Sequence, residues 1–245
     1  MPILFINKNI GLTPKELVDE YKINNNIKKV SYCGRLDPMA SGLMLILTEE
    51  DCKAQDKFMK LSKTYEFKLV FGINTDSHDP LNSNIKLYDE FINVDELNKL
   101  IESKYLGLIK QSYPLCSSYT IDINNKKIPI WKAFKTNILP EGFELPYKYI
   151  NISEFTINNA YKVNDKELFN DFIQDITNVT DINKNFGKKE AINFYKNNIN
   201  NKEYQVVDCK VTGSSGTYIR GLARDIANDL KLHCIAYKIK RINIF

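Results

Sequence analysis

The chain has 245 residues, of which 43% are hydrophobic, and its net charge is +4 at neutral pH. This length and apolar content suit one globular unit, so we expect a single domain over residues 1–245. The five cysteines form no C-x-x-C pair, which argues against a zinc cluster or a disulfide framework. The apolar runs are too short to span a membrane, and the first residues lack the basic segment of a signal peptide. We therefore expect a soluble, cytoplasmic protein without a metal.

The basic residues are unevenly distributed by type. Of the 34 lysines and arginines, only Arg35, Arg220, Arg224 and Arg241 are arginine. Arginine presents a planar fork that binds carboxylates or phosphates with two hydrogen bonds, whereas lysine is a point charge. This clustering indicates that the stretch near residue 35 and the last 26 residues meet in space, unless it is accidental.

The first predicted elements are a short strand over residues 3–7 and a helix that begins at the turn 11–14. Thr13 is a suitable N-cap, and Pro14 is suited to the first helical position. The asparagines at 24–26 should end this helix.

Residues 33–47 read CGRLDPMASGLMLIL and contain an Asp-Pro pair before an apolar strand at 43–47. The residue before a proline favours extended geometry, so Asp37 should lie on a turn, with Gly42 free to adopt a positive φ. This turn presents one carboxylate at the edge of a buried strand. An isolated Asp-Pro more often stabilises only its own turn, so a catalytic role for Asp37 depends on the rest of the chain.

Two elements follow this turn. Residues 49–62 have the apolar spacing of an amphipathic helix, and residues 63–72 alternate as a strand with Tyr65 on its apolar face. Taken alone, Asp76 and Asp79 would be solvated turn residues, and His78 would lie on the surface.

The middle of the chain predicts a helix at 95–105 and strand-like alternation at 140–163. Between them, lysines alternate with Trp131 and Phe134, a pattern that can bind phosphates and stack on bases, or can form an ordinary hairpin with a solvated lysine face. Residues 164–203 are rich in asparagine and lysine but keep helical apolar spacing, which indicates a helical insertion.

The last elements are a strand at 204–211, a helix after the small residues 213–217, and a strand at 236–245. We expect Thr217 to cap this helix, whose apolar side includes Leu222 and Ile226. Arg220 lies in its first turn.

Three motifs in these stretches together resemble those of the TruB-type tRNA pseudouridine synthase family. The pattern G-x-L-D-P-x-A-x-G is found at 34–42, K-x-Y at 63–65 with a looser T-D-x-x-D at 75–79, and S-x-G-T-Y-I-R at 214–220. Arg35 and the S-G-L at 41–43 are closer to other branches of the superfamily. The third motif favours the TruB type.

The resemblance implies an α+β pseudouridine synthase fold, in which a mixed, mostly antiparallel sheet is bisected by the active-site cleft. It also implies a thumb-like, RNA-gripping insertion at about 111–139, and it makes the helical insertion at about 164–203 an addition to the common fold. Many relatives continue into a PUA domain, and we expect none here.

The resemblance makes Asp37 the catalytic carboxylate, acting either as a nucleophile at the sugar or as a base at the 2′ position. It implies a surrounding substrate-binding set that comprises Tyr32, Tyr65, Tyr218, Arg220 and Ile239. Arg220 would hold Asp37 ionised through a two-pronged pair, and Tyr65 would stack on the target uracil. Tyr218 and Ile239 would form the pocket walls. Tyr32 stands where the family has a histidine that wedges into the RNA.

The implied reaction is isomerisation of uridine to pseudouridine, on the T-loop uridine in the T arm of tRNA, by a monomer without cofactor or metal. Two alternatives stay open. One is a non-catalytic tRNA-binding or tRNA-folding protein on the same fold, and the other is an RNA-guided pseudouridine synthase.

Overall fold

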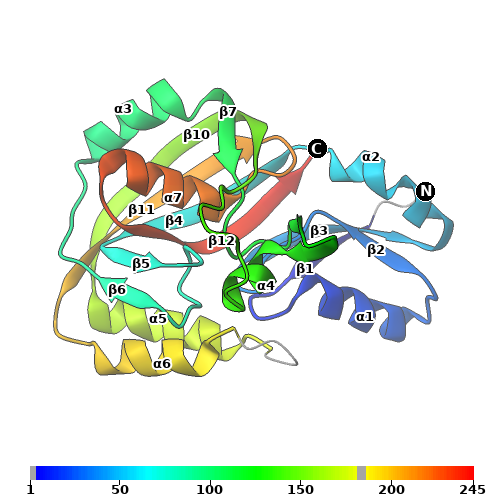
Figure 1. Cartoon of the computed structure of the whole chain (residues 1–245), viewed down its shortest axis with the longest axis horizontal. Helices are drawn as coiled ribbons and strands as arrows, with labels where there is room; N and C mark the ends of the chain where they lie inside the picture. Colours follow the sequence, from blue (N-terminus) through cyan, green and yellow to red (C-terminus); the bar gives the residue numbers. More distant parts are fainter. Residues whose placement is uncertain (1–3, 181–185) are drawn as a thin grey trace.

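Figure 1 shows the computed structural model, which describes residues 4–180 and 186–245. A large sheet runs through the molecule, with helices on both of its faces. In chain order the elements are β1 (Leu4–Lys8), α1 (Pro14–Asn25), β2 (Val30–Cys33), β3 (Ser41–Thr48), a 3₁₀ helix (Glu49–Ala54), α2 (Gln55–Met59), β4 (Lys63–Phe71), β5 (Ile73–Thr75), β6 (Ile85–Leu87), α3 (Val94–Lys104), β7 (Gly107–Ser112), β8 (Thr120–Ile123), β9 (Lys126–Pro129), α4 (Ile130–Lys135), β10 (Tyr147–Asn164), α5 (Asp165–Thr177), α6 (Lys188–Asn197), β11 (Glu203–Gly213), α7 (Ile219–Leu230) and β12 (Cys234–Ile244).

The main sheet has eight strands, in the order β1-β3-β12-β4-β11-β10-β7, with β2 paired to β3 outside this path. Neighbouring strands are antiparallel except for β3 and β12, which are parallel. The prediction of an α+β fold around a mixed, mostly antiparallel sheet is confirmed.

The pairing between β3 and β12 is the shortest in the main sheet. These strands pair only through Ser41 with Lys240 and Gly42 with Arg241, which we call the joint. Gly42 has a φ of +106°, and a Cβ on it would lie 2.2 Å from the carbonyl oxygen of Arg241. Only glycine therefore lets the backbones approach closely enough to form the joint. The Asp37 turn immediately precedes this joint.

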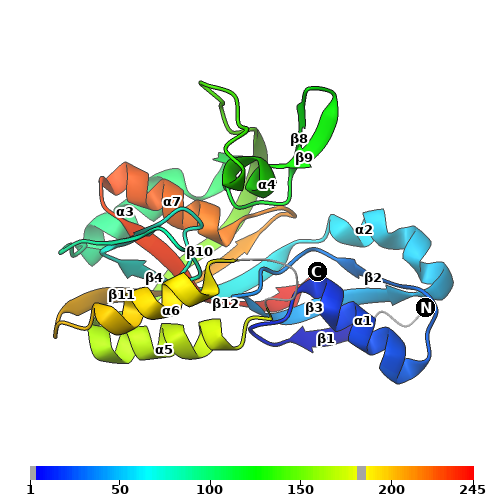
Figure 2. The same ribbon diagram turned by 60° about the horizontal axis from the view of Figure 1, so that its bottom comes forward.

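Helices cover the two faces of the sheet with separate apolar clusters (Figure 2). On one face, α3 and α7 bury Leu97, Ile101, Leu222 and Ile226. On the other, α5 and α6 bury an aromatic cluster that includes Phe169, Phe172 and Tyr195. The helices predicted within residues 164–203 are thus present, and they form the cover of one sheet face.

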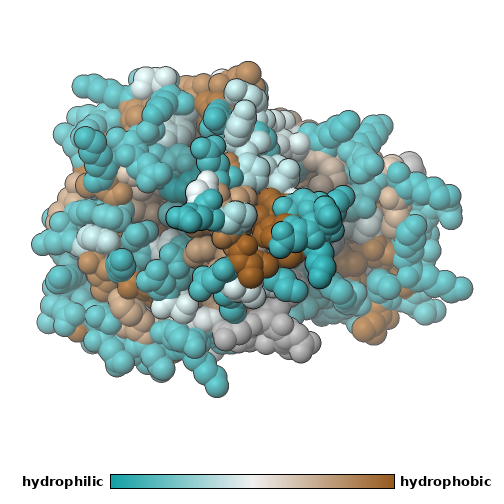
Figure 3. Space-filling model, viewed as in Figure 1, coloured by the Kyte–Doolittle hydropathy of each residue, from teal (hydrophilic) through white to brown (hydrophobic). Residues whose placement is uncertain are grey.

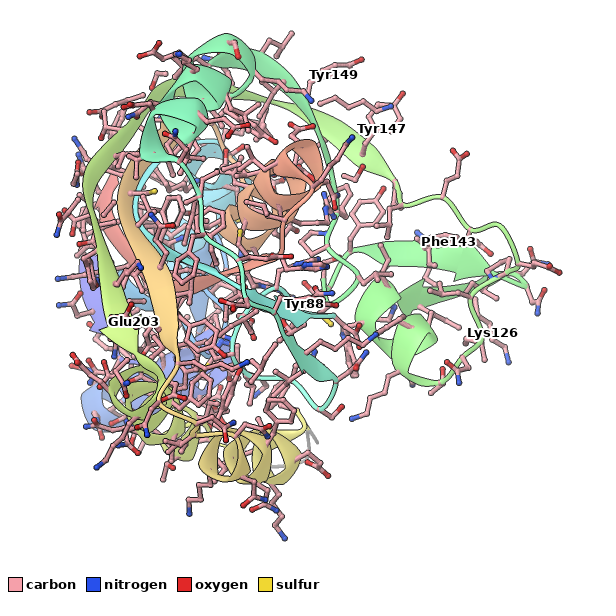
Figure 4. The ribbon with its side chains drawn as sticks, turned by 90° about the vertical axis from the view of Figure 1, so that its left-hand side faces the viewer. Tyr88, Lys126, Phe143, Tyr147, Tyr149 and Glu203 are labelled. Carbon is pink, nitrogen blue, oxygen red and sulfur yellow. The ribbon has the colours of Figure 1, made fainter. Side chains whose placement is uncertain are left out.

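A small subdomain of β8, β9 and α4 projects from the sheet (Figure 4), and Lys126 marks its hairpin. It occupies residues 120–135, inside the stretch predicted to form a thumb-like insertion. Its helix buries Ile130 and Ala133 but leaves Trp131 39% exposed. The face of the molecule in Figure 3 is mostly hydrophilic, with an apolar patch near its centre.

Two local predictions are wrong. Residues 49–62 form a 3₁₀ helix followed by the short α2 instead of one amphipathic helix. Glu49 has a positive φ, and its carboxylate accepts from the backbone N–H groups of Lys28 and Lys29, so the chain cannot begin a regular helix there. The N-cap of α7 is Tyr218 and not Thr217, whose hydroxyl donates to the carbonyl of Ser214.

The predictions for the first helix, α1, are confirmed. Thr13 caps α1 in a capping box with Glu16, and Pro14 is the first helical residue. No helix in the described part of the chain is long and apolar enough to cross a membrane.

Gly42→Ala tests the joint. The added methyl group must displace the Arg241 backbone, so we expect the free energy of unfolding to fall by more than roughly 3 kcal/mol. Gly107→Ala is the matched control, because Gly107 also has a positive φ but nothing lies within 4 Å of its Cβ position. It should lose only roughly 1 kcal/mol in urea unfolding. Equal losses would show that the close approach at the joint is not the constraint.

Candidate active site

Asp37 lies on a tight turn at the start of the joint. The N–H of Ala40 donates to the carbonyl of Asp37 at 3.0 Å, and the N–H of Gly11 donates to the carbonyl of Pro38 at 2.8 Å. These bonds fix the turn from both sides and leave the Asp37 side chain 42% exposed. Among the described residues, only Arg220 donates a hydrogen bond to its carboxylate, so one oxygen is left available to a substrate.

Arg220 is buried in the first turn of α7 and joins three segments of the chain. Its Nε donates to Asp37 Oδ2 at 2.7 Å, its Nη1 to the carbonyl of Ser77 at 2.7 Å, and its Nη2 to the carbonyl of Cys116 at 3.3 Å. The stretch near residue 35 and the last 26 residues, which the sequence predicts to be close in space, are in contact here through Asp37 and Arg220. The expected two-pronged pair is wrong, because the Nη groups bind backbone carbonyls and only Nε reaches Asp37.

A second carboxylate, Asp79, completes the surroundings of Arg220. Asp79 is only 6% exposed, and its Oδ2 lies 3.6 Å from Arg220 Nε. Its Oδ1 accepts from the Ser77 hydroxyl and from the N–H of Leu81. Burial raises the pKa of Asp79 to about 6, against the opposing effect of Arg220. Burial alone would lower the pKa of Arg220, but Asp37 and Asp79 hold it above its ordinary value.

The Asp37 carboxylate faces a cavity of about 810 Å³. Tyr65 on β4, Tyr218 before α7 and Ile239 on β12 all line this cavity together with Asp37 and Arg220. Both Tyr65 and Ile239 are nearly buried, so they present a firm apolar wall. The structure therefore brings five of the six residues predicted for the site to one cavity.

Tyr218 is held in place by residues that the sequence did not indicate. The amide of the fully buried Gln111 binds the backbone N–H and the carbonyl of Tyr218. The ring of Tyr113 packs edge-on at 5.6 Å, and Lys148 Nζ lies 4.8 Å from the centre of the Tyr218 ring. Burial lowers the pKa of Lys148 to about 8. Nothing in the local sequence marks Gln111 or Lys148, because they act through contacts between distant strands.

Tyr32 is not among the residues that line the cavity. It lies on β2, opposite Ile46 of β3, and packs half-buried against the core cluster of the α3 and α7 face.

His78 differs from its predicted surface position. It is half-buried, its carbonyl accepts from the N–H of Ala236, and it lines a separate cavity of about 310 Å³ beside α7. Burial, together with Arg224 and Arg220, lowers its pKa to about 4. Within residues 4–180 and 186–245, no three His, Cys, Asp or Glu side chains gather as a possible metal site.

Comparison with known proteins identifies the family. The model of the TruB family pseudouridylate synthase N-terminal domain matches residues 22–168. The chain therefore belongs to the TruB family.

Two curated relatives illustrate the similarity. A tRNA pseudouridine synthase B of Ureaplasma urealyticum is 33% identical over 155 residues, covering 63% of this chain and 65% of the relative. One of Endomicrobium trichonymphae is 28% identical over 249 residues, covering 99% of this chain and 85% of the relative. The chain spans just under two thirds of the length of the first relatives it matches.

Solved structures share the fold at low sequence identity. A Cbf5-Nop10-Gar1 complex contains a chain with a TM-score of 0.59 and 15% identity, covering 99% of this chain and 48% of that one. An H/ACA RNP bound to a substrate RNA gives a TM-score of 0.57 and 14% identity, with 99% and 47% covered. These similarities support the pseudouridine synthase fold.

The raised pKa of Asp79 predicts a pH dependence of stability. Between its unfolded pKa near 4 and its folded pKa of about 6, the folded state binds more protons, so its contribution to stability is lost as pH rises through this window. Asp79→Asn mimics the protonated form. From pH 4 to pH 6 the unfolding free energy of the wild type should therefore fall relative to this variant, by on the order of 2 kcal/mol.

Urea unfolding at several pH values measures this difference. Asp76→Asn is the control, because Asp76 lies on the same loop but is only partly buried. A difference between wild type and Asp79→Asn that does not change with pH would contradict the account.

Proposed function

We propose that this chain isomerises uridine to pseudouridine in tRNA, acting on the T-loop uridine with Asp37 as the catalytic carboxylate. The observation that carries the proposal is the contact between Asp37 and the buried Arg220, which leaves one carboxylate oxygen facing a cavity. Membership of the TruB family and relatives named tRNA pseudouridine synthase B support the reaction and the RNA class.

The reaction breaks the bond between N1 of uracil and C1′ of ribose and then joins C5 to C1′, with loss of the C5 proton. Asp37 starts it in one of two ways: its free oxygen attacks C1′, or it removes the 2′ proton. Both routes need an ionised carboxylate with an unoccupied oxygen. Arg220 meets that need because its single hydrogen bond to Asp37 occupies Oδ2 alone.

The cavity suits a nucleotide turned out of its loop. Its volume of about 810 Å³ lies in the range of sites that enclose small ligands. The Tyr65 ring offers a surface for stacking, which holds a base without reading its neighbours. A uridine inside the duplex or a stacked loop cannot reach Asp37, so the target must be flipped into the cavity.

The subdomain of β8, β9 and α4 is proposed to grip the T arm. Its hairpin and helix carry lysines beside the partly exposed Trp131, and it projects near the mouth of the cavity, where Ser117, Ser118 and Tyr119 form part of the lining. Lysines supply salt-dependent contacts to phosphates, and aromatic rings supply stacking.

Asp37→Asn tests the role of the carboxylate. Purified protein and unmodified tRNA transcript are incubated without other RNA, and pseudouridine is mapped by position. We expect product at the T loop with the wild type and a loss of at least about 10³-fold in the variant. Affinity for tRNA should change by no more than a few-fold, because phosphate contacts dominate it.

Three outcomes would contradict the proposal. Binding without product from the wild type would indicate a non-catalytic RNA-binding protein, and product only after addition of a guide RNA would indicate a guided synthase. Turnover retained by Asp37→Asn would remove Asp37 from the mechanism.

Arg220→Lys tests whether the planar fork is needed beyond its charge. An ammonium cannot reach Asp37 and the carbonyls of Ser77 and Cys116 in the geometry of the guanidinium, so the single-turnover rate should fall by about 100-fold or more. Arg224→Lys is the matched control: Arg224 lies on the same helix and binds the carbonyls of Ser112 and Tyr113 instead of Asp37. Equal rates in the two variants would exclude a special role for Arg220.

A further inference from the structure

Two buried cations at one end of the Asp37 cavity have no carboxylate partner. Lys63 is 3% exposed and Arg241 is 1% exposed, and both line the cavity. Within the described residues, no carboxylate oxygen lies within 4.0 Å of either group. Burying a charge is costly unless an opposite charge or hydrogen bonds compensate it, so the absence of a counter-charge requires an explanation.

Backbone carbonyls satisfy only part of these two groups. Lys63 Nζ donates to the carbonyls of Met59 and Leu61, which leaves one of its three N–H bonds unused. Arg241 uses Nε and Nη2 to bind Leu43, Gly34 and Met44, and no described acceptor binds its Nη1. The pKa of Lys63 is lowered to about 8, mainly by burial and next by the positive charge of the nearby Arg241. This is expected for a cation without a counter-charge.

The unused donors converge on Gly34. The position of a Cβ on Gly34 would be 3.3 Å from Arg241 Nη1 and 3.9 Å from Lys63 Nζ, so the two nitrogens are no more than about 7 Å apart. One phosphate group can accept from both across this distance. Because Gly34 has no side chain, the space between the two donors stays open.

We propose that Gly34, Lys63 and Arg241 form a phosphate subsite that binds one phosphodiester of the RNA strand next to the flipped nucleotide. The proposal rests on the proposed function, because it takes the occupant of the cavity to be RNA. The negative charge of the phosphodiester supplies the missing counter-charge, and its oxygens accept from the unused donors.

The position of the subsite fits a neighbouring linkage. Lys63 and Tyr65 lie two residues apart on β4 and therefore face the same side of the sheet, roughly 7 Å apart. Arg241 is the β12 partner of Tyr65. When a base stacks on Tyr65, the subsite therefore lies about one nucleotide along the strand from the phosphate of that base. Arg220 and Asp79 are not part of the subsite.

A paired substitution in protein and RNA tests the contact. T-arm stem-loops are made in which one loop phosphate at a time is replaced by an uncharged methylphosphonate. Their affinities are measured for proteins carrying Asp37→Asn, which prevents turnover, with and without Lys63→Met. We expect one linkage at which neutralisation weakens binding about tenfold when Lys63 is present and less than about twofold when it is methionine.

Lys60→Met is the matched control, because Lys60 lines the same cavity but is exposed. It should retain the tenfold effect at that linkage. Lys63→Arg keeps the charge and should restore a linkage-specific loss, and this separates a lost contact from a misfolded variant.

The outcomes separate the subsite from the proposed reaction. Identical position profiles with and without Lys63→Met would overturn the subsite, even if the wild-type protein forms pseudouridine. A linkage-specific loss that depends on Lys63 would support the subsite, even if the wild-type protein forms no product.

Discussion

The burial of the Arg220 guanidinium is the constraint on which the site depends. A buried guanidinium stays charged, so the surrounding segments must supply acceptors and opposite charge. They do so from three directions: the Asp37 turn, the loop with Ser77 and Asp79, and the carbonyl of Cys116 at the base of the projecting subdomain. One side chain therefore fixes the relative positions of the Asp37 turn, the loop with Ser77 and Asp79, and the base of the projecting subdomain.

The sheet provides the frame for this arrangement. Within the described residues, the strands of its two parts pair with each other only at the joint, where the close approach of Gly42 to Arg241 places the Asp37 turn beside β12 and β4. The aromatic cluster under α5 and α6 covers one face of the sheet, while α7 covers the other and carries Arg220 in its first turn. Packing on both faces thus makes the cavity largely preformed, which lowers the cost of ordering the site when a ligand binds.

Short-range chemistry explains what the sequence predicted well. The Asp-Pro turn, the positive φ of Gly42 and the Thr13 cap depend on neighbouring residues, and all three are found in the structure. The sequence indicates Asp79 only through a loose motif match and does not predict that this residue is buried. Its burial depends on the packing of its loop against Arg220, which is distant in the sequence. Gln111 carries no local signal, since its role arises from its contacts with Tyr218, which is distant in the sequence. The two-pronged Arg220 pair was wrong for the same reason: distant carbonyls take the other donors.

The most direct test is a structure of the protein bound to a T-arm stem-loop. The account predicts that the target base stacks on Tyr65 and that its C1′ or 2′ position lies about 3.5 Å from the free oxygen of Asp37. Arg220 should keep its hydrogen bond to the other oxygen. A flipped nucleotide bound elsewhere, or an Asp37 carboxylate turned away from the ribose while the RNA fills the cavity, would contradict the account.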